Sequence, residues 1–120
     1  MSDIIEINDL KVCFRVGVPD IERATPQVLL ITLRLHHDFR AAAAKDDLQE
    51  TIDYDYLTRS LDEWGKQREW KLIETLACHL ADWVLLHFPV SKVEITIKKY
   101  ILEQTRHVAV MIKRNQPAES

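Results

Sequence analysis

The sequence predicts an α+β domain in which a four-stranded antiparallel sheet carries two helices on one face. Apolar and polar residues alternate over 4–16, 27–39, 93–99 and 108–112, as is typical of strands. Apolar residues recur at three- and four-residue steps over 54–65 and 70–88, as is typical of helices. Two hairpins separated by two helices place both helices on the same face of the sheet, in the order ββααββ.

The first hairpin contains an irregularity. Within 4–16 the parity of the apolar residues shifts at Asn8 and Asp9, which indicates either a β-bulge in one long strand or a turn between two short strands. Turn-forming residues follow at 17–20, and the second strand then pairs with the first. Its apolar face consists of Leu29, Ile31, Leu33 and Leu35.

Local signals also bound the helices. Alanines at 41–44 favour a short helical stretch, and 45–48 forms a polar connection. Asp53 is the predicted N-cap of the next helix, and Gly65 marks its end or lies one turn before it. The apolar stripe of that helix is Tyr54, Leu57, Leu61 and Trp64, and that of the last helix is Ile73, Leu76, Ala77, Leu80, Val84 and His87. We expect one domain over 1–115 and a disordered tail over 116–120.

Composition excludes several classes of function. A chain of 120 residues with 47% apolar and 29% charged residues is an ordinary single globular domain. A net charge of −3 gives no electrostatic reason to expect nucleic acid or an acidic membrane. No segment has the pattern of a signal peptide or the length of a membrane span. Cys13 and Cys78 lack a CxxC spacing and read as reduced thiols. We therefore expect a cytoplasmic protein.

Common catalytic motifs are also missing from the sequence. With only Gly17 and Gly65, the chain can build neither a phosphate-binding loop nor a dinucleotide fingerprint. The histidines do not fall at standard metal-ligand spacings, and we expect no metal and no cofactor. The candidates that remain are single residues in unusual places.

Glu74 is the first of these candidates. It lies in the first turn of the last helix, on a stripe shared with Cys78, Ala81 and Leu85, where a buried carboxylate is costly unless it is paired. The helix dipole and the free N–H groups of that turn would stabilise the carboxylate and could bind an acceptor beside it. This combination suits a flat heterocycle with N–H donors and one acceptor. On this stretch alone, an exposed first-turn glutamate is the favoured alternative.

Three other residues carry weaker signals. Lys99 continues the apolar face of its strand, where burial favours the neutral amine that a general base requires. The alternative is a strand-end lysine that reaches water. Tyr54 is either a core residue or a proton donor, and Glu22 is either part of a site or a solvated turn residue.

Five segments in the same order resemble the dihydroneopterin aldolase family. The segments are Val16-Gly17-Val18 with Glu22-Arg23 and Gln27; Asp46-Asp47-Leu48; Thr51-Ile52-Asp53-Tyr54; Leu72-Ile73-Glu74 with Ala77; and 93–99. The resemblance implies a tunnelling fold, in which four subunits close their sheets into a barrel and two rings often stack. It therefore implies a homo-oligomer, either tetramer or octamer, with pterin sites between subunits.

The resemblance also implies roles for individual residues. Glu74 and the backbone near Ile73 would hold the amino-pyrimidine edge of the pterin, with further substrate contacts from Ile52 and Asp53. Tyr54 of a neighbouring subunit would pack on the ring and take part in proton transfer. Lys99 would be the general base, acting through water, and Glu22 would support it.

The implied reaction cleaves 7,8-dihydroneopterin into 6-hydroxymethyl-7,8-dihydropterin and glycolaldehyde in folate biosynthesis. A related epimerase, which inverts C2′ of dihydroneopterin triphosphate, is one alternative, with Arg23, Lys98 and Arg106 as candidate phosphate ligands. A non-catalytic pterin- or purine-binding protein is the other. Tyr100 stands where the family usually has proline.

Overall fold

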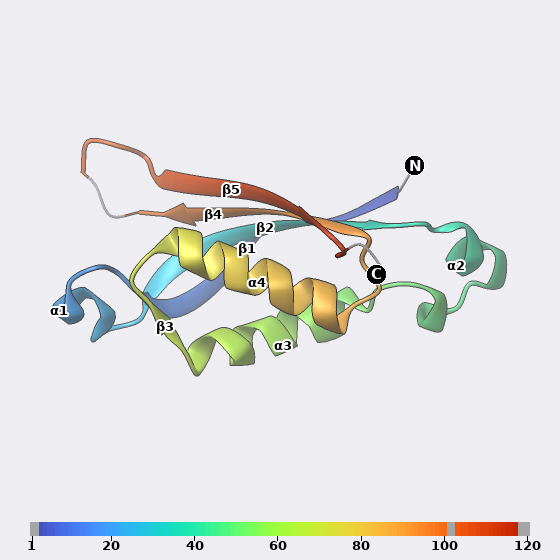
Figure 1. Cartoon of the computed structure of the whole chain (residues 1–120), viewed down its shortest axis with the longest axis horizontal. Coiled ribbons are helices and arrows are strands. Elements are labelled where there is room, and N and C mark those ends of the chain that lie inside the picture. The colour runs from blue at the N-terminus through green and yellow to red at the C-terminus, as the bar shows by residue number, and fades with distance from the viewer. Residues whose placement is uncertain (1–2, 101–102, 118–120) are drawn as a thin grey trace.

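A curved sheet forms one layer of the fold, and two long helices lie side by side across one of its faces (Figure 1). The computed structural model describes residues 3–100 and 103–117. Its strands are β1 (Asp3–Val16), β2 (Gln27–His37), β3 (Glu69–Trp70), β4 (Lys92–Lys99) and β5 (Val108–Asn115). Its helices are α1 (Asp20–Arg23), α2 (Arg40–Lys45), the 3₁₀ helix η1 (Leu48–Glu50), α3 (Tyr54–Lys66) and α4 (Ile73–His87).

The α+β class is confirmed, but the predicted four-stranded antiparallel sheet is wrong in one respect. The sheet has five strands in the order β3-β1-β2-β4-β5, and the short β3 runs parallel to the end of β1. The amide of Gly17 extends this pairing by donating to the carbonyl of Trp70 at 3.0 Å. Two residues are too few to show a hydrophobic period, so the alternation of side chains could not reveal this strand.

The parity shift in β1 is a β-bulge in one long strand. Pairing with β2 is continuous except between Ile7 and Leu10, and Asp9 adopts a positive φ of 52°. The hydroxyl of Thr32 accepts a hydrogen bond from the amide of Asp9 at 3.0 Å and donates to Asn8 Oδ1 at 3.1 Å. The bulge keeps the apolar residues before and after it on the face that meets the helices.

The helix boundaries agree with the local signals, with one revision at Gly65. Asp53 is the N-cap of α3, and its carboxylate accepts from the amide of Tyr56 at 3.0 Å. Gly65 lies within the last turn of α3, where a β-carbon would overlap the ring of Phe14. A residue without a side chain is therefore needed at this position, because it lets α3 approach β1 closely. Gly65 has this packing role in addition to lying near the end of the helix.

The core lies between the sheet and the inner faces of α3 and α4. Leu29, Ile31, Leu33 and Leu35 of β2 are fully buried, as predicted. Two members of the predicted helix stripes are not in this core. Tyr54 is 59% exposed, and His87 is exposed at the end of α4. Both lie in a terminal turn of their helix.

The C-terminal segment is bound to the domain at Gln116. Its side-chain amide donates to the carbonyls of Leu85 at 2.7 Å and Val90 at 2.9 Å, and its backbone amide donates to Ser91 at 3.0 Å. Gln116 was placed in the disordered tail by the sequence, and these contacts revise the start of that tail. Residues 118–120 lie outside the described part of the chain.

Candidate active site

Lys99 and Glu22 form an ion pair at one end of the sheet. Lys99 is the last residue of β4, and its Nζ lies 2.7 Å from Oε2 of Glu22 in α1. Both side chains are largely sheltered from solvent, with 13% and 21% of their surface exposed. Lys98, the next residue back, lies on the other face of β4 and pairs with Asp9 at 3.0 Å. The prediction that Lys99 continues the inward, apolar face of its strand is thus confirmed.

The environment of Glu22 favours its ionised form. The hydrogen bond from Lys99 lowers the pKa of Glu22 below the ordinary value of 4.5, and a hydrogen bond from Gln27 acts in the same direction. Gln27 Nε2 lies 3.0 Å from Glu22 Oε2 and 2.6 Å from the carbonyl oxygen of Val16. Gln27 therefore links the carboxylate to the end of β1 and fixes its orientation.

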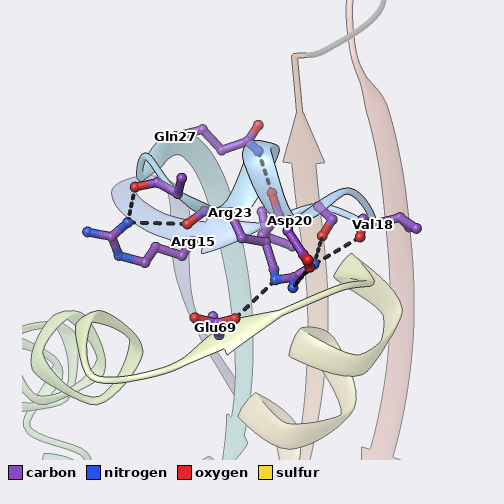
Figure 2. A network of polar contacts seen from close by, with 9 residues as sticks. Arg15, Val18, Asp20, Arg23, Gln27 and Glu69 are labelled. Carbon is purple, nitrogen blue, oxygen red and sulfur yellow. Dashed lines mark hydrogen bonds and ion pairs between the residues drawn. The ribbon is translucent and has the colours of Figure 1, made fainter.

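The turn between β1 and β2 brings Glu22 to this position. Gly17 adopts a φ of +148°, which favours glycine, and the chain then makes the single turn of α1. The guanidinium of Arg23 holds the turn together by donating to the carbonyl oxygens of Gly17 and Val18 at 2.8 and 2.9 Å (Figure 2). Turn residues were expected at 17–20, whereas the helical turn and its arginine contacts were not.

Next to the ion pair is an open cleft of about 310 Å³. One wall comes from the start of α4, including Ile73 and Glu74, and the opposite wall from Lys99 and two valines of β5. The complete lining is Val18, Glu22, Lys71, Leu72, Ile73, Glu74, Lys99, Val108 and Val110. Four of the residues that the sequence selected, Glu22, Ile73, Glu74 and Lys99, thus come together.

Of the two interpretations of Glu74, the structure agrees with the exposed first-turn glutamate. Glu74 is exposed in this chain and forms part of the cleft wall. The N-cap position of α4 is Leu72, which provides no side-chain cap. The carboxylate therefore stands beside backbone N–H groups that no capping side chain occupies.

Ile52, Asp53 and Tyr54 lie elsewhere. They precede or begin α3, which runs opposite to α4, so the first turns of the two helices are at opposite ends of the helix layer (Figure 1). The side chain of Ile52 is buried in the core, and the carboxylate of Asp53 caps the helix. Tyr54 projects into solvent. Within a single chain, these three residues are not brought to the cleft.

Sequence reasoning did not select Gln27, Gly17 or Lys71 as parts of the site. Gln27 was noticed only as part of a motif, although a polar residue at the first position of a strand, five residues after Glu22, is a usable signal. Gly17 was assigned to a turn, but its contact with Glu22 depends on the tertiary structure. Lys71 adds a second cation to the cleft wall.

Two features are absent from the described residues. In 3–100 and 103–117, no group of three or more His, Cys, Asp and Glu side chains is arranged to bind a metal ion. Within the same ranges, no helix has the length and apolar character needed to cross a membrane.

An α+β domain with a lysine–carboxylate pair beside a small cleft is typical of enzymes that act on small molecules. The family model for FolB, dihydroneopterin aldolase, matches residues 5–113. The chain belongs to the dihydroneopterin aldolase family, and the activity of that family is that of a lyase.

Individual relatives agree with this assignment. A dihydroneopterin aldolase of Streptomyces coelicolor is 33% identical over 97 residues, covering 81% of this chain and 82% of the relative. The solved structure of FolB from Vibrio cholerae has a TM-score of 0.91 and 29% identity, covering 96% of this chain and 98% of that one. The Escherichia coli dihydroneopterin aldolase, solved in complex with neopterin, has a TM-score of 0.89 and 26% identity, covering 94% and 99%.

Proposed function

We propose that this protein cleaves 7,8-dihydroneopterin into 6-hydroxymethyl-7,8-dihydropterin and glycolaldehyde, at the cleft between the start of α4 and the end of β4. The observation that carries the proposal is the contact of Lys99 with Glu22 at 2.7 Å, on the wall of a cleft that also includes Glu74. The neopterin bound to the Escherichia coli relative supports a pterin as the ligand. We further propose that the enzyme works in the cytoplasm.

Glu74 and the first turn of α4 would bind the pterin ring. The 2-amino group and ring N–H of a pterin are donors that match a carboxylate, and the ring carbonyl is an acceptor that matches a backbone N–H. Glu74 and the uncapped amides after Leu72 offer this combination on one wall of the cleft. The amide of Ile73 or of its neighbour would supply the N–H group.

Lys99 would then transfer the protons of the reaction. Removal of the 2′-hydroxyl proton, through a water molecule, lets the C1′–C2′ bond break with release of glycolaldehyde. The electron pair of that bond passes to the C6=N5 imine of the dihydropterin, and a proton returned to C1′ completes the product. The ring itself accepts the electrons, so the protein has to orient it and to transfer protons. Glu22 would hold the amine of Lys99 in place for this step.

Tyr54 would join the site from a second copy of the chain. It is 59% exposed at the far end of the helix layer and cannot reach the cleft of its own subunit. The sheet also ends in β5 and thus presents a long strand edge to which another sheet can pair. We propose a closed ring of subunits, tetramer or octamer, in which Tyr54, Ile52 and Asp53 of one copy border the cleft of the next.

The aldolase reaction is preferred to epimerisation of the triphosphate because two of the candidate phosphate ligands are occupied. Arg23 donates to two backbone carbonyls and pairs with Asp20 and Glu69, and Lys98 pairs with Asp9 on the other face of the sheet. A phosphate group would have to displace these contacts. The Lys99–Glu22 pair also favours an enzyme over a non-catalytic pterin-binding protein.

The test compares alanine variants of Lys99, Lys98 and Glu74. Lys99→Ala is expected to abolish conversion of 7,8-dihydroneopterin with a modest loss of pterin affinity, whereas Glu74→Ala abolishes binding itself. Lys98→Ala is the matched control, since it removes the same side chain from the opposite face, and it is expected to retain turnover. Product formation and neopterin binding by calorimetry are measured for each. Full glycolaldehyde release by Lys99→Ala would overturn the proposed mechanism.

A further inference from the structure

We propose that Arg23 is a positioning residue of this active site: its guanidinium fixes the turn over 17–23 so that the carboxylate of Glu22 stays against Lys99. The inference rests on the proposed function, because the position of Glu22 matters to turnover only if Lys99 transfers the proton. Arg23 itself is not part of the cleft wall.

Arg23 binds four acceptors, three within the turn itself and one in β3. Its Nη1 donates to the carbonyl oxygens of Gly17 and Val18, its Nη2 to Asp20 at 2.5 Å, and its Nε to Glu69 at 3.0 Å (Figure 2). Only 11% of the side chain is exposed. The guanidinium thus lies inside the turn that it holds, and it also ties that turn to β3.

Apolar packing does little to fix the shape of the turn. None of the four residues of α1 is buried, and no side chain caps this helix. Val18 is 62% exposed and Ile21 is 84% exposed, so no apolar side chain anchors the turn in the core. Polar contacts must therefore define its conformation. Arg23 makes four of them from within the turn, and Gln27 bonds the Glu22 carboxylate directly. Arg15 assists from outside by donating to the carbonyl oxygens of Arg23 and Ala24.

The ion pairs of Arg23 do not by themselves explain its burial. Asp20 is 96% exposed and Glu69 is 60% exposed, and pairs with such exposed carboxylates contribute little to stability. The bonds to the carbonyls of Gly17 and Val18 are different, because they set the path of the backbone directly before Glu22. We therefore expect the loss of Arg23 to affect catalysis more than stability.

Arginine is required for this arrangement. Its planar fork can donate in several fixed directions at once, whereas a lysine is a single point donor on a flexible chain. A lysine at this position could reach one carboxylate but could not hold two carbonyls and two carboxylates together. The contact with Glu69 also joins the turn to β3, which leads directly into the first turn of α4. Arg23 thus links the segment that carries Glu22 with the one that carries Glu74.

The experiment is a double-mutant cycle on the full-length enzyme. Arg23→Gln and Glu22→Gln are made singly and together, and kcat and KM for 7,8-dihydroneopterin are measured with the thermal midpoint of each variant. We expect Arg23→Gln to lower kcat by about tenfold or more and to change KM by less than about threefold. In the Glu22→Gln background the same change should lower kcat by less than about twofold, because Arg23 acts through Glu22. Arg23→Lys should not restore kcat.

Arg34→Gln is the matched control. Arg34 also pairs with two carboxylates, Glu6 and Glu94, but on the opposite face of the sheet. Arg34→Gln should lower the thermal midpoint by about as much as Arg23→Gln does, but it should leave kcat unchanged. If Arg23→Gln does not fold, the cycle is run with Arg23→Lys and judged by the same criterion.

Each outcome separates this inference from the proposed function. If Glu22→Gln lowers kcat but Arg23→Gln does not, or if the two effects multiply in the double variant, the role of Arg23 is overturned while the proposed function stands. If neither Glu22→Gln nor Lys99→Ala lowers kcat, the proposed role of the Lys99–Glu22 pair fails, and the role of Arg23 fails with it. If the parent protein releases no glycolaldehyde, the proposed function itself fails.

Discussion

The side chain of Glu22 occupies the space where a β-carbon on Gly17 would stand. A methyl group built there would overlap Cδ and Cγ of the glutamate and lie 2.5 Å from its Oε1. Gly17 also has a φ of +148°, a conformation that other residues rarely adopt. The glycine therefore serves two purposes, since it allows the chain to turn and leaves room for a carboxylate of the candidate site.

Gly17→Ala is expected to lower kcat by about tenfold or more and the free energy of unfolding by about 1–3 kcal/mol. The methyl group displaces Glu22 from Lys99 and strains the backbone as well. Steady-state kinetics and urea unfolding measure the two effects. The matched control is Gly65→Ala, which crowds the ring of Phe14 in the core. It should lower stability by about 1–3 kcal/mol while folded molecules keep their turnover. Equal kinetic losses in both variants would contradict this account.

The Lys99–Glu22 pair should make the free energy of unfolding depend on pH. The hydrogen bond from Lys99 lowers the pKa of Glu22 below 4.5 in the folded protein, so the unfolded carboxyl binds protons more readily. The stabilisation is therefore complete above the unfolded pKa and is lost as the pH falls through the lower folded value. Urea unfolding at about pH 7 and about pH 3.5 should show a smaller loss of stability in Glu22→Gln than in the parent protein. A parallel decline of both proteins would count against the pair.

Asp53 should stabilise α3 as its N-cap, whether or not it also contacts the substrate in an oligomer. Asp53→Ala removes the acceptor for the amide of Tyr56 and should cost about 1 kcal/mol, measured by urea unfolding. Asp53→Asn keeps a good capping side chain and should cost much less. If both variants retain pterin binding, the substrate contact inferred for Asp53 is removed from the proposal and the cap remains.

Gln116 should contribute to stability from outside the sheet. Gln116→Ala removes two hydrogen bonds, to the carbonyls of Leu85 and Val90, and should lower the free energy of unfolding by about 1–2 kcal/mol. An unchanged midpoint in Gln116→Ala would show that these bonds add nothing in solution.

Features that depend on neighbours along the chain could be predicted from the sequence. The parity shift at Asn8 and Asp9, the cap at Asp53 and the inward parity of Lys99 each follow from a local spacing or a local side-chain bond. The structure confirms the cap and the inward lysine, and it shows that the parity shift is a bulge and not a turn. The resemblance of the motifs to one family added the pairing of Lys99 with Glu22, which no spacing could give. The family assignment itself is confirmed.

Features that depend on the tertiary structure could not be predicted in this way. The strand β3 exists because β1 offers a partner at Arg15 and Val16, and a two-residue segment carries no pattern of its own. Glu74 and Tyr54 both stand in the first turn of a helix, and there the periodicity of the core no longer decides which residues are buried. The proposed contact of Tyr54 with a neighbouring cleft requires a second molecule, and one sequence cannot position it.

Removal of a single residue at the bulge of β1 would make the strand regular, because one residue of β1 would then lie opposite Thr32. Ile5 and Ile7 would keep their places on the face that meets the helices, and the register from Leu10 onward would be unaffected. The turn that carries Glu22 lies beyond this point. The loss of one residue here should therefore be absorbed at the bulge and leave the candidate site at the far end of β1 unchanged.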